Sequence, residues 1–186
     1  MPIEAELKAV VRDPEAVMDQ LERDWGHGRA QVYRDTYYDA PDGSLMRADR
    51  ELRIRTVHSD SDTHTVLTYK GARVDDASGS KPEHETRVDD EAAAHAIVRG
   101  LGFVSRIAFE KRCRNYTSTR HGRELLATLV RVPEIDGTFL ELETMAGDER
   151  DLVPALTVVR AALQDLGIGD DDLTTELYTD AVAAAR

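Results

Sequence analysis

Polar and apolar residues alternate in the first strand-like segment of the chain, residues 3 to 11. Glu4, Glu6 and Lys8 share one face of the extended strand, and the apolar residues between them share the other. Such a strand usually buries one face and exposes the other to solvent. The patterns in the other segments are needed to tell whether this polar face is exposed to solvent.

Further strands and helices are predicted from the same kind of pattern. The predicted strands after the first are residues 31–39, 51–57, 64–71, 81–88, 106–116, 123–132 and 137–146. The predicted helices are residues 13–25, 89–102, 151–166 and 173–184. Asp13 and Pro14 form a strong helix start, and residues 73–80 have the composition of a mobile loop. No linker or solenoid repeat divides the chain, so we expect one α+β domain over residues 1–186, dominated by antiparallel strands.

Composition limits the classes of function. The 36 acidic residues outnumber the 24 Lys and Arg residues, giving a formal charge of -12, which argues against a broad nucleic-acid surface. No apolar run is long enough for a membrane span, and the first residues lack the apolar core of a secretion signal, so we expect a cytoplasmic protein without membrane contact. The single cysteine, Cys113, excludes an internal disulfide.

Charges of one sign share faces on several predicted strands. Arg53 and Arg55 share a face, as do Glu141 and Glu143. Residues 81–87 place Lys81, Glu83, Glu85 and Arg87 on one face. Two further basic groups are Lys70 and the cluster of Lys111, Arg112 and Arg114. Solvent-exposed strands would mix signs more freely, because like charges on neighbouring positions repel.

A closed antiparallel barrel offers these faces a second location, its lumen. A divalent cation needs several carboxylate oxygens, and a polyphosphate needs several Lys and Arg side chains. A metal-bound triphosphate would satisfy both sets of charges. The charge pattern alone does not distinguish three structures. They are a tunnel for a metal-bound triphosphate, a sheet with one solvated face, and a barrel that binds an ordinary small ligand.

The ordered motifs resemble a known family. The ExExK strand (Glu4, Glu6, Lys8) is followed by TYYDAP, LRIR, TYKG, KPEHE, EKRCR and GTFLELE in the order found in the CYTH, or triphosphate tunnel metalloenzyme, superfamily. The resemblance spans residues 3 to about 145, and ELYTD is similar to the start of the family's C-terminal helix. The QVYRDTYYDAP stretch and the short chain look most like the class IV adenylyl cyclase branch.

This resemblance implies a fold and a set of roles. The fold would be an eight-stranded antiparallel β-barrel, the triphosphate tunnel, with helices packed around it. The side chains that would hold phosphate oxygens are Lys8, Arg53, Arg55, Lys70, Arg87, Lys111 and one or both of Arg112 and Arg114. The side chains that would bind Mg²⁺ or Mn²⁺ are Glu4, Glu6, Glu141 and Glu143. Glu83 or Glu85 would orient or deprotonate the nucleophile, and Lys8 is included in the catalytic set.

The sequence departs from the family pattern at two positions. Arg131 stands at about the place where this branch often has a metal-binding Asp, which would weaken a second metal site unless Glu134 or Asp136 substitutes. Cys113 stands where a basic residue is common, and a partly buried structural cysteine is favoured over a nucleophile. If Lys111 faces inward, Arg112 and Arg114 face outward unless a bulge shifts the register.

Three activities stay open at this point, and we favour the first of them. The first is a metal-dependent class IV adenylyl cyclase, which converts ATP to cyclic AMP and pyrophosphate. The second is a triphosphatase that hydrolyses tripolyphosphate, thiamine triphosphate or a nucleotide to release orthophosphate. The third is a phosphate-binding module without catalysis. Each would take a small triphosphate as its ligand, and the sequence leaves open whether the chain forms a homodimer.

Overall fold

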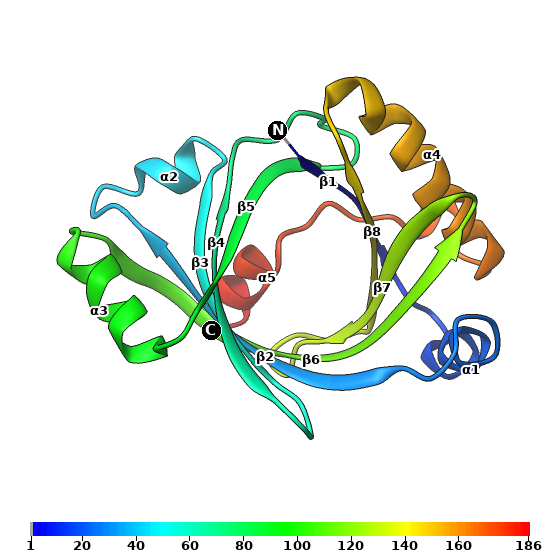
Figure 1. Ribbon diagram of the computed structural model, residues 1–186, viewed down its shortest axis with the longest axis horizontal. Helices are drawn as coiled ribbons and strands as arrows, with labels where there is room; N and C mark the ends of the chain where they lie inside the picture. The colour runs from blue at the N-terminus through cyan, green and yellow to red at the C-terminus, as the bar shows by residue number, and fades with distance from the viewer. Residues whose placement is uncertain (1) are drawn as a thin grey trace.

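The computed structural model describes residues 2–186, and eight antiparallel strands close into a barrel (Figure 1). The strands are β1 (Ile3–Val10), β2 (Arg29–Asp39), β3 (Glu51–His58), β4 (Thr63–Lys70), β5 (Lys81–Val88), β6 (Val104–Arg120), β7 (Arg123–Arg131) and β8 (Phe139–Ala146). Their order around the barrel is β1-β5-β4-β3-β2-β6-β7-β8. This architecture confirms the predicted barrel.

The barrel closes at an uneven seam. β1 pairs with β8 at eight positions, from Ile3 with Ala146 to Val10 with Phe139. On its other side β1 pairs with β5 only at Ile3 with Pro82 and Glu4 with Lys81. Pro82 lacks a backbone N–H and suits the short pairing at this seam. The N-terminal polar face therefore belongs to the wall of a closed barrel.

Helices cover the outside of the barrel, and one lies across an end. The helices are α1 (Pro14–Asp24), α2 (Ser44–Arg47), α3 (Glu91–Gly100), α4 (Glu149–Asp165), the 3-10 helix η1 (Asp170–Asp172) and α5 (Tyr178–Ala185). Helices α1 and α4 cover β1, β7 and β8, where Leu21 and Val159 are fully buried. Helix α3 covers the opposite side through Ala94 and Val98. No helix among residues 2–186 is long and apolar enough to cross a membrane.

Helix α5 packs against an apolar cluster formed by lumen-facing side chains. Tyr178 and Val182 of α5 are buried in the same cluster as Phe109 and Phe139. The rings of Tyr178 and Phe139 meet edge to face, with centroids 5.4 Å apart. This packing fills part of the lumen with apolar side chains.

Two expected element boundaries were wrong. The last helix begins at Tyr178 instead of residue 173, because Leu173 forms a β-bridge with Ala9 and the Thr174 N–H donates to the Lys8 carbonyl at 2.8 Å. Strand β6 is longer than expected because it pairs with β2 in its first part and with β7 in its second. Pairing with distant strands decides both boundaries, and local sequence does not record it.

Candidate triphosphate and metal site

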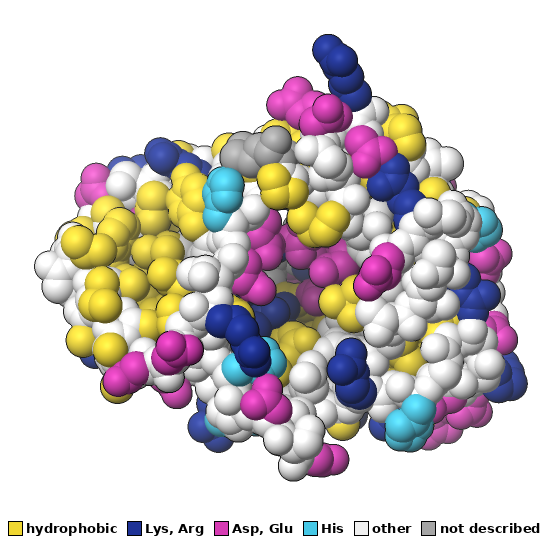
Figure 2. All heavy atoms as spheres, in the orientation of Figure 1, with side chains coloured by type: hydrophobic (Ala, Val, Ile, Leu, Met, Phe, Trp, Pro, Cys, Tyr) yellow, Lys and Arg dark blue, Asp and Glu magenta, His cyan; other side chains and the backbone are white. Residues whose placement is uncertain are grey.

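A cavity of about 330 Å³ lies in the barrel lumen and is lined mainly by charged side chains. Figure 2 shows the hollow at the centre of one face, with acidic and basic side chains gathered in it. The charged residues in its wall are Glu4, Glu6, Lys8, Glu51, Arg53, Arg55, Lys70, Lys81, Glu83, Glu85, Lys111, Glu141 and Glu143. The polar face of β1 therefore borders this charged cavity, referred to below as the chamber.

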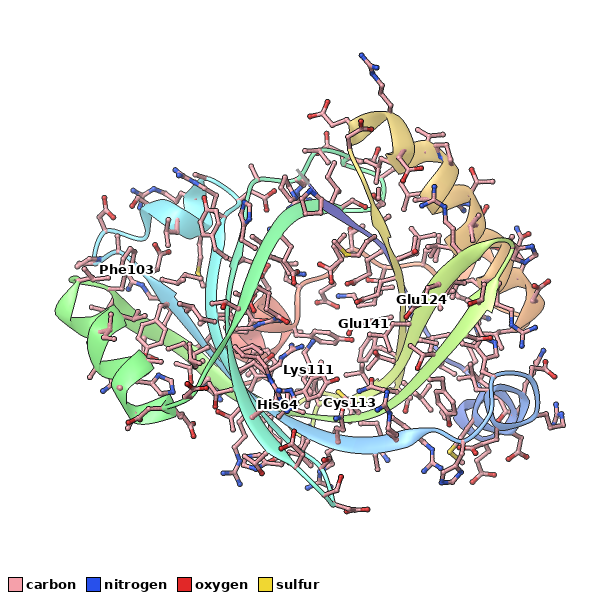
Figure 3. All side chains as sticks on the ribbon, in the orientation of Figure 1. His64, Phe103, Lys111, Cys113, Glu124 and Glu141 are labelled. Atoms are coloured by element: carbon pink, nitrogen blue, oxygen red, sulfur yellow. The ribbon has the colours of Figure 1, made fainter. Side chains whose placement is uncertain are left out.

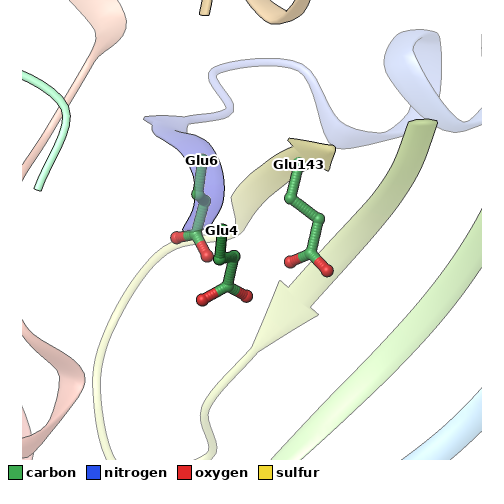
Figure 4. Close-up of side chains that lie close together, drawn as sticks. All are labelled: Glu4, Glu6 and Glu143. Carbon is green, nitrogen blue, oxygen red and sulfur yellow. The ribbon is translucent and has the colours of Figure 1, made fainter. Parts of the chain in front are cut away.

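Three of the carboxylates predicted to bind metal lie together. Oxygen atoms of Glu4, Glu6 and Glu143 lie within 4.8 Å of one another (Figure 4). Their position follows from the strand register, because Glu6 stands directly opposite Glu143 in the β1–β8 pair and Glu4 is two residues along the same face. Like charges directly opposite each other destabilise a sheet unless a cation lies between them.

Electrostatics in this triad favours a bound cation. Burial, with the charges of Glu141 and Glu4, raises the pKa of Glu6 to about 8. Burial, with Glu4 and Glu6, also raises the pKa of Glu143 well above its ordinary value. Burial opposes ionisation of Glu4 as well, but Lys70, a hydrogen bond with Glu83 and the charge of Arg53 together outweigh it and lower the Glu4 pKa to about 2. Several carboxylate oxygens gathered in this way are the donor set that Mg²⁺ and Mn²⁺ prefer, so these residues fit a divalent metal.

The fourth predicted ligand, Glu141, lies apart from the triad. Its Oε1 atom is 3.3 Å from the Lys111 Nζ, and Figure 3 shows both side chains inside the barrel. Burial would raise the pKa of Glu141, but the charges of Lys111, Lys8 and Arg55 and a hydrogen bond with Tyr178 together outweigh it and lower this pKa. Glu141 is thus already paired with cations of the protein.

The basic residues of the chamber differ in how far acids neutralise them. Arg55 donates from Nε and Nη2 to both carboxylate oxygens of the fully buried Asp35, each at 2.7 Å. Arg53 has no such partner, because its nearest carboxylate is Glu85 at 3.8 Å and its buried Nε has no hydrogen bond. An unpartnered buried guanidinium atom is suited to a phosphate oxygen. Arg53 is therefore the basic side chain best prepared to receive an anion.

The two predicted catalytic glutamates have different surroundings. Glu83 Oε2 lies 2.9 Å from the Lys70 Nζ, and burial together with Glu4 raises the Glu83 pKa. Glu85 is more exposed, with 42% of its side chain accessible, and accepts a hydrogen bond from the Thr68 hydroxyl at 2.8 Å. A carboxylate with a raised pKa is the better base near neutral pH.

Lys8, the third predicted catalytic residue, is held by the C-terminal segment. It donates to the Glu176 carbonyl, and its Nζ lies 4.3 Å from the centre of the Tyr178 ring. The Lys111 Nζ lies 4.1 Å from the centre of the same ring. Tyr178 thus joins two lysines predicted to bind phosphate, although Tyr178 was not among the predicted site residues.

The structure corrects three predicted phosphate contacts. Arg112 lies outside the lumen beside Glu110, and Arg114 lies outside it with its Nη2 2.7 Å from Glu22. They face outward because Lys111 faces inward, and the strand has no bulge between them. Arg87 follows the parity of Glu83 and Glu85 but lies beyond the cavity wall, 66% exposed and 3.4 Å from Asp62.

The structure also shows where the two residues that depart from the family pattern, Arg131 and Cys113, lie. Arg131 is exposed and lies opposite Arg112 on the outer face, so it places no cation among the lumen carboxylates. Glu134 forms an ion pair with Arg186 outside the chamber and does not substitute for a missing acid. Cys113 is buried among apolar side chains, and burial raises its pKa to about 12, which keeps it a thiol and not a nucleophile.

Strand parity could have revealed that Asp35 and Tyr37 face the lumen. Both lie on the inward face of β2, and Tyr37 lines the cavity. Asp39 has the same parity, but its carboxylate accepts backbone N–H groups of Leu45 and Met46 and therefore holds the turn before α2. Tyr37 therefore belongs to the lumen wall, whereas Asp39 has a structural role in the turn.

Comparison with known proteins places this barrel in a family. The family model described as "CYTH domain" matches residues 2–178. The chain belongs to the CYTH domain family. A relative from Methanocaldococcus jannaschii named "Putative adenylate cyclase MJ0240" is 27% identical over 177 residues, covering 95% of this chain and 96% of that protein. Sequence motifs and family model thus agree.

Solved structures of other proteins share the CYTH fold of this chain. A protein from Pyrococcus horikoshii has a TM-score of 0.86 and 24% identity, with 98% of this chain and 99% of that one covered. A Vibrio parahaemolyticus protein described as a "putative adenylate cyclase" has a TM-score of 0.81 and 18% identity, covering 97% and 98% of the two chains. A Hippeastrum protein described as a "Putative adenylyl cyclase" with "a dominant triphophatase activity" has a TM-score of 0.68 and 16% identity, covering 100% and 97%.

Proposed function

We propose that this protein is a metal-dependent enzyme that binds a triphosphate in the barrel lumen, and that its reaction is of the class IV adenylyl cyclase type. The observation that supports it most is one cavity that contains both a cluster of three carboxylates and the Arg53 guanidinium, whose buried Nε has no hydrogen-bond partner. The cluster suits Mg²⁺ or Mn²⁺, and the basic side chains suit the phosphate chain.

In this proposal each side chain has a defined task. Glu4, Glu6 and Glu143 hold the metal, which when bound neutralises charge on the reacting phosphate. Arg53 and Lys70 bind phosphate oxygens in the same cavity. Cyclisation forms a bond between the ribose 3′-oxygen and the α-phosphorus and breaks the bond from that phosphorus to the oxygen of the leaving pyrophosphate.

The proton of the attacking hydroxyl needs an acceptor. Glu83 suits this task better than Glu85, because its pKa is raised and its carboxylate borders both the metal cluster and Lys70. With water in place of the ribose hydroxyl and the terminal phosphorus as its target, the same base would support hydrolysis. The triphosphatase activity named for the Hippeastrum protein favours this hydrolytic reaction as a second candidate.

Phosphorus NMR distinguishes these activities. The protein is incubated with ATP or with tripolyphosphate, in the presence of Mg²⁺ or Mn²⁺. Cyclic AMP with pyrophosphate supports the cyclase, and orthophosphate supports the triphosphatase. Binding of the triphosphate without turnover would overturn both and favour a binding module. The matched control for Glu6→Gln is Glu124→Gln on the exposed part of β7: the first variant is expected to lose turnover and the second to keep it.

A further inference from the structure

An internal cation contacts the cluster proposed to bind metal. The Lys70 ammonium contacts the Glu4 carboxylate and lies 2.9 Å from Glu83 Oε2. The three side chains come from β4, β1 and β5, and between 12% and 17% of each is exposed. Among residues 2–186, this is the only ion pair that involves a member of the carboxylate triad. Lys70 thus occupies an oxygen that a metal would need.

The other cations of the chamber do not have this position. Arg55 is bound to Asp35, and Lys111 lies beside Glu141, outside the triad. Lys70 also differs from Arg55 in the geometry of its side chain, because its charge is at the end of a flexible four-carbon chain and can move without a change in the backbone. The ammonium can therefore exchange one anionic partner for another nearby.

We propose that Lys70 couples triphosphate binding to metal binding. In the ligand-free protein Lys70 neutralises Glu4 and keeps a divalent cation from using it. When a triphosphate enters, Lys70 turns to a phosphate oxygen and leaves the Glu4 carboxylate to the metal. The identity of the triphosphate rests on the proposed function, but the coupling itself requires no turnover. Since coupling is reciprocal, the metal strengthens triphosphate binding by the same factor.

The test measures Mn²⁺ affinity by electron paramagnetic resonance, with and without a non-hydrolysable tripolyphosphate analogue. Lys70→Met is expected to bind Mn²⁺ alone about fivefold or more tightly than the unaltered protein, because Glu4 is released. The analogue should then strengthen Mn²⁺ binding less in this variant than in the unaltered protein. Lys70→Gln is a second variant with the same expectation, and it retains a hydrogen-bond donor for Glu4 if Lys70→Met does not fold.

The matched control is Lys111→Met, which removes the same charge from the same cavity beside Glu141 instead of Glu4. It should strengthen Mn²⁺ binding clearly less than Lys70→Met does. Equal effects of the two variants, or no tightening in the Lys70 variants, would overturn the coupling. Tightening in a protein that turns over neither ATP nor tripolyphosphate would support the coupling and refute only the proposed function. Turnover without tightening would refute only the coupling.

Discussion

Glu6→Gln should change the pH dependence of folding stability in a way that an exposed glutamate cannot. Glu6 stands opposite Glu143, and burial with the charges of Glu141 and Glu4 raises its pKa to about 8. Between the ordinary pKa and this raised value, the folded protein binds a proton that the unfolded chain releases. Stability of the metal-free protein therefore falls as pH rises through this window.

The size of the effect follows from the two pKa values of Glu6. The ordinary value is 4.5 and the folded value is about 8. Each pKa unit corresponds to about 1.4 kcal/mol, so ionising Glu6 in the folded protein costs on the order of 5 kcal/mol at pH values above the window. Glutamine carries no charge at any pH, so the variant should lack this loss. The pKa values of Glu143 and Glu83 are also raised, so the variant should still show the loss of stability that these two residues cause at high pH.

The assay is urea denaturation followed by circular dichroism at about pH 5 and about pH 9, with all metal removed by a chelator. The unaltered protein should lose more stability between these pH values than Glu6→Gln does. Adding Mn²⁺ should stabilise the unaltered protein more at the higher pH, because there the metal replaces a missing proton on Glu6. Glu124→Gln is the matched control and should behave as the unaltered protein, since Glu124 is exposed on β7.

Two results would refute this reasoning. The first is that, without metal, neither the unaltered protein nor Glu6→Gln changes in stability between the two pH values. The other is Mn²⁺ that stabilises Glu6→Gln as strongly as it stabilises the unaltered protein. The acid side provides an internal comparison: the Glu4 pKa is lowered to about 2, so its stabilising contribution should be lost as pH falls from 4.5 towards that value.

Two further predictions concern the basic residues. Arg55→Ala should lower the free energy of unfolding by about 3–5 kcal/mol, because it leaves the buried Asp35 carboxylate unpaired, and the double variant Arg55→Met with Asp35→Leu should recover much of this loss in urea denaturation. Arg112→Ala and Arg114→Ala should leave triphosphate affinity unchanged in isothermal titration calorimetry, whereas Arg53→Ala should weaken it; a clear loss in either of the first two would place a phosphate contact outside the lumen.

Strand parity made much of the barrel wall predictable from sequence. The rule that alternate side chains share a face, together with a reason for like charges to gather, was enough to predict the lumen positions of Glu4, Glu6, Arg53 and Lys70. The family motifs then supplied the closed barrel, which alternation alone did not distinguish from a solvated sheet. Parity also predicted that Arg112 would face away from Lys111, and the structure bears this out.

Other parts of the site depend on contacts that no local pattern records. Tyr178 reaches Lys8 because the preceding segment pairs with β1, and the bond between Thr174 and the Lys8 carbonyl connects positions far apart in the chain. Arg87 has the correct parity, but where the cavity ends along β5 depends on the shape of the barrel. Glu141 has the parity of Glu143, but its contact with Lys111 of another strand is a pairing that parity does not reveal.

Charge balance in the lumen explains why metal and triphosphate should bind together. The charged wall residues include seven glutamates and six Lys or Arg side chains, so the wall is close to neutral when all are ionised. A triphosphate brought in alone would leave several negative charges in a poorly solvated space, and a metal brought in alone would compete with the Lys70 ammonium for Glu4. Each ligand supplies the charge that the other requires. A lumen of nearly balanced charge is therefore better suited to a metal-bound triphosphate than to either component alone.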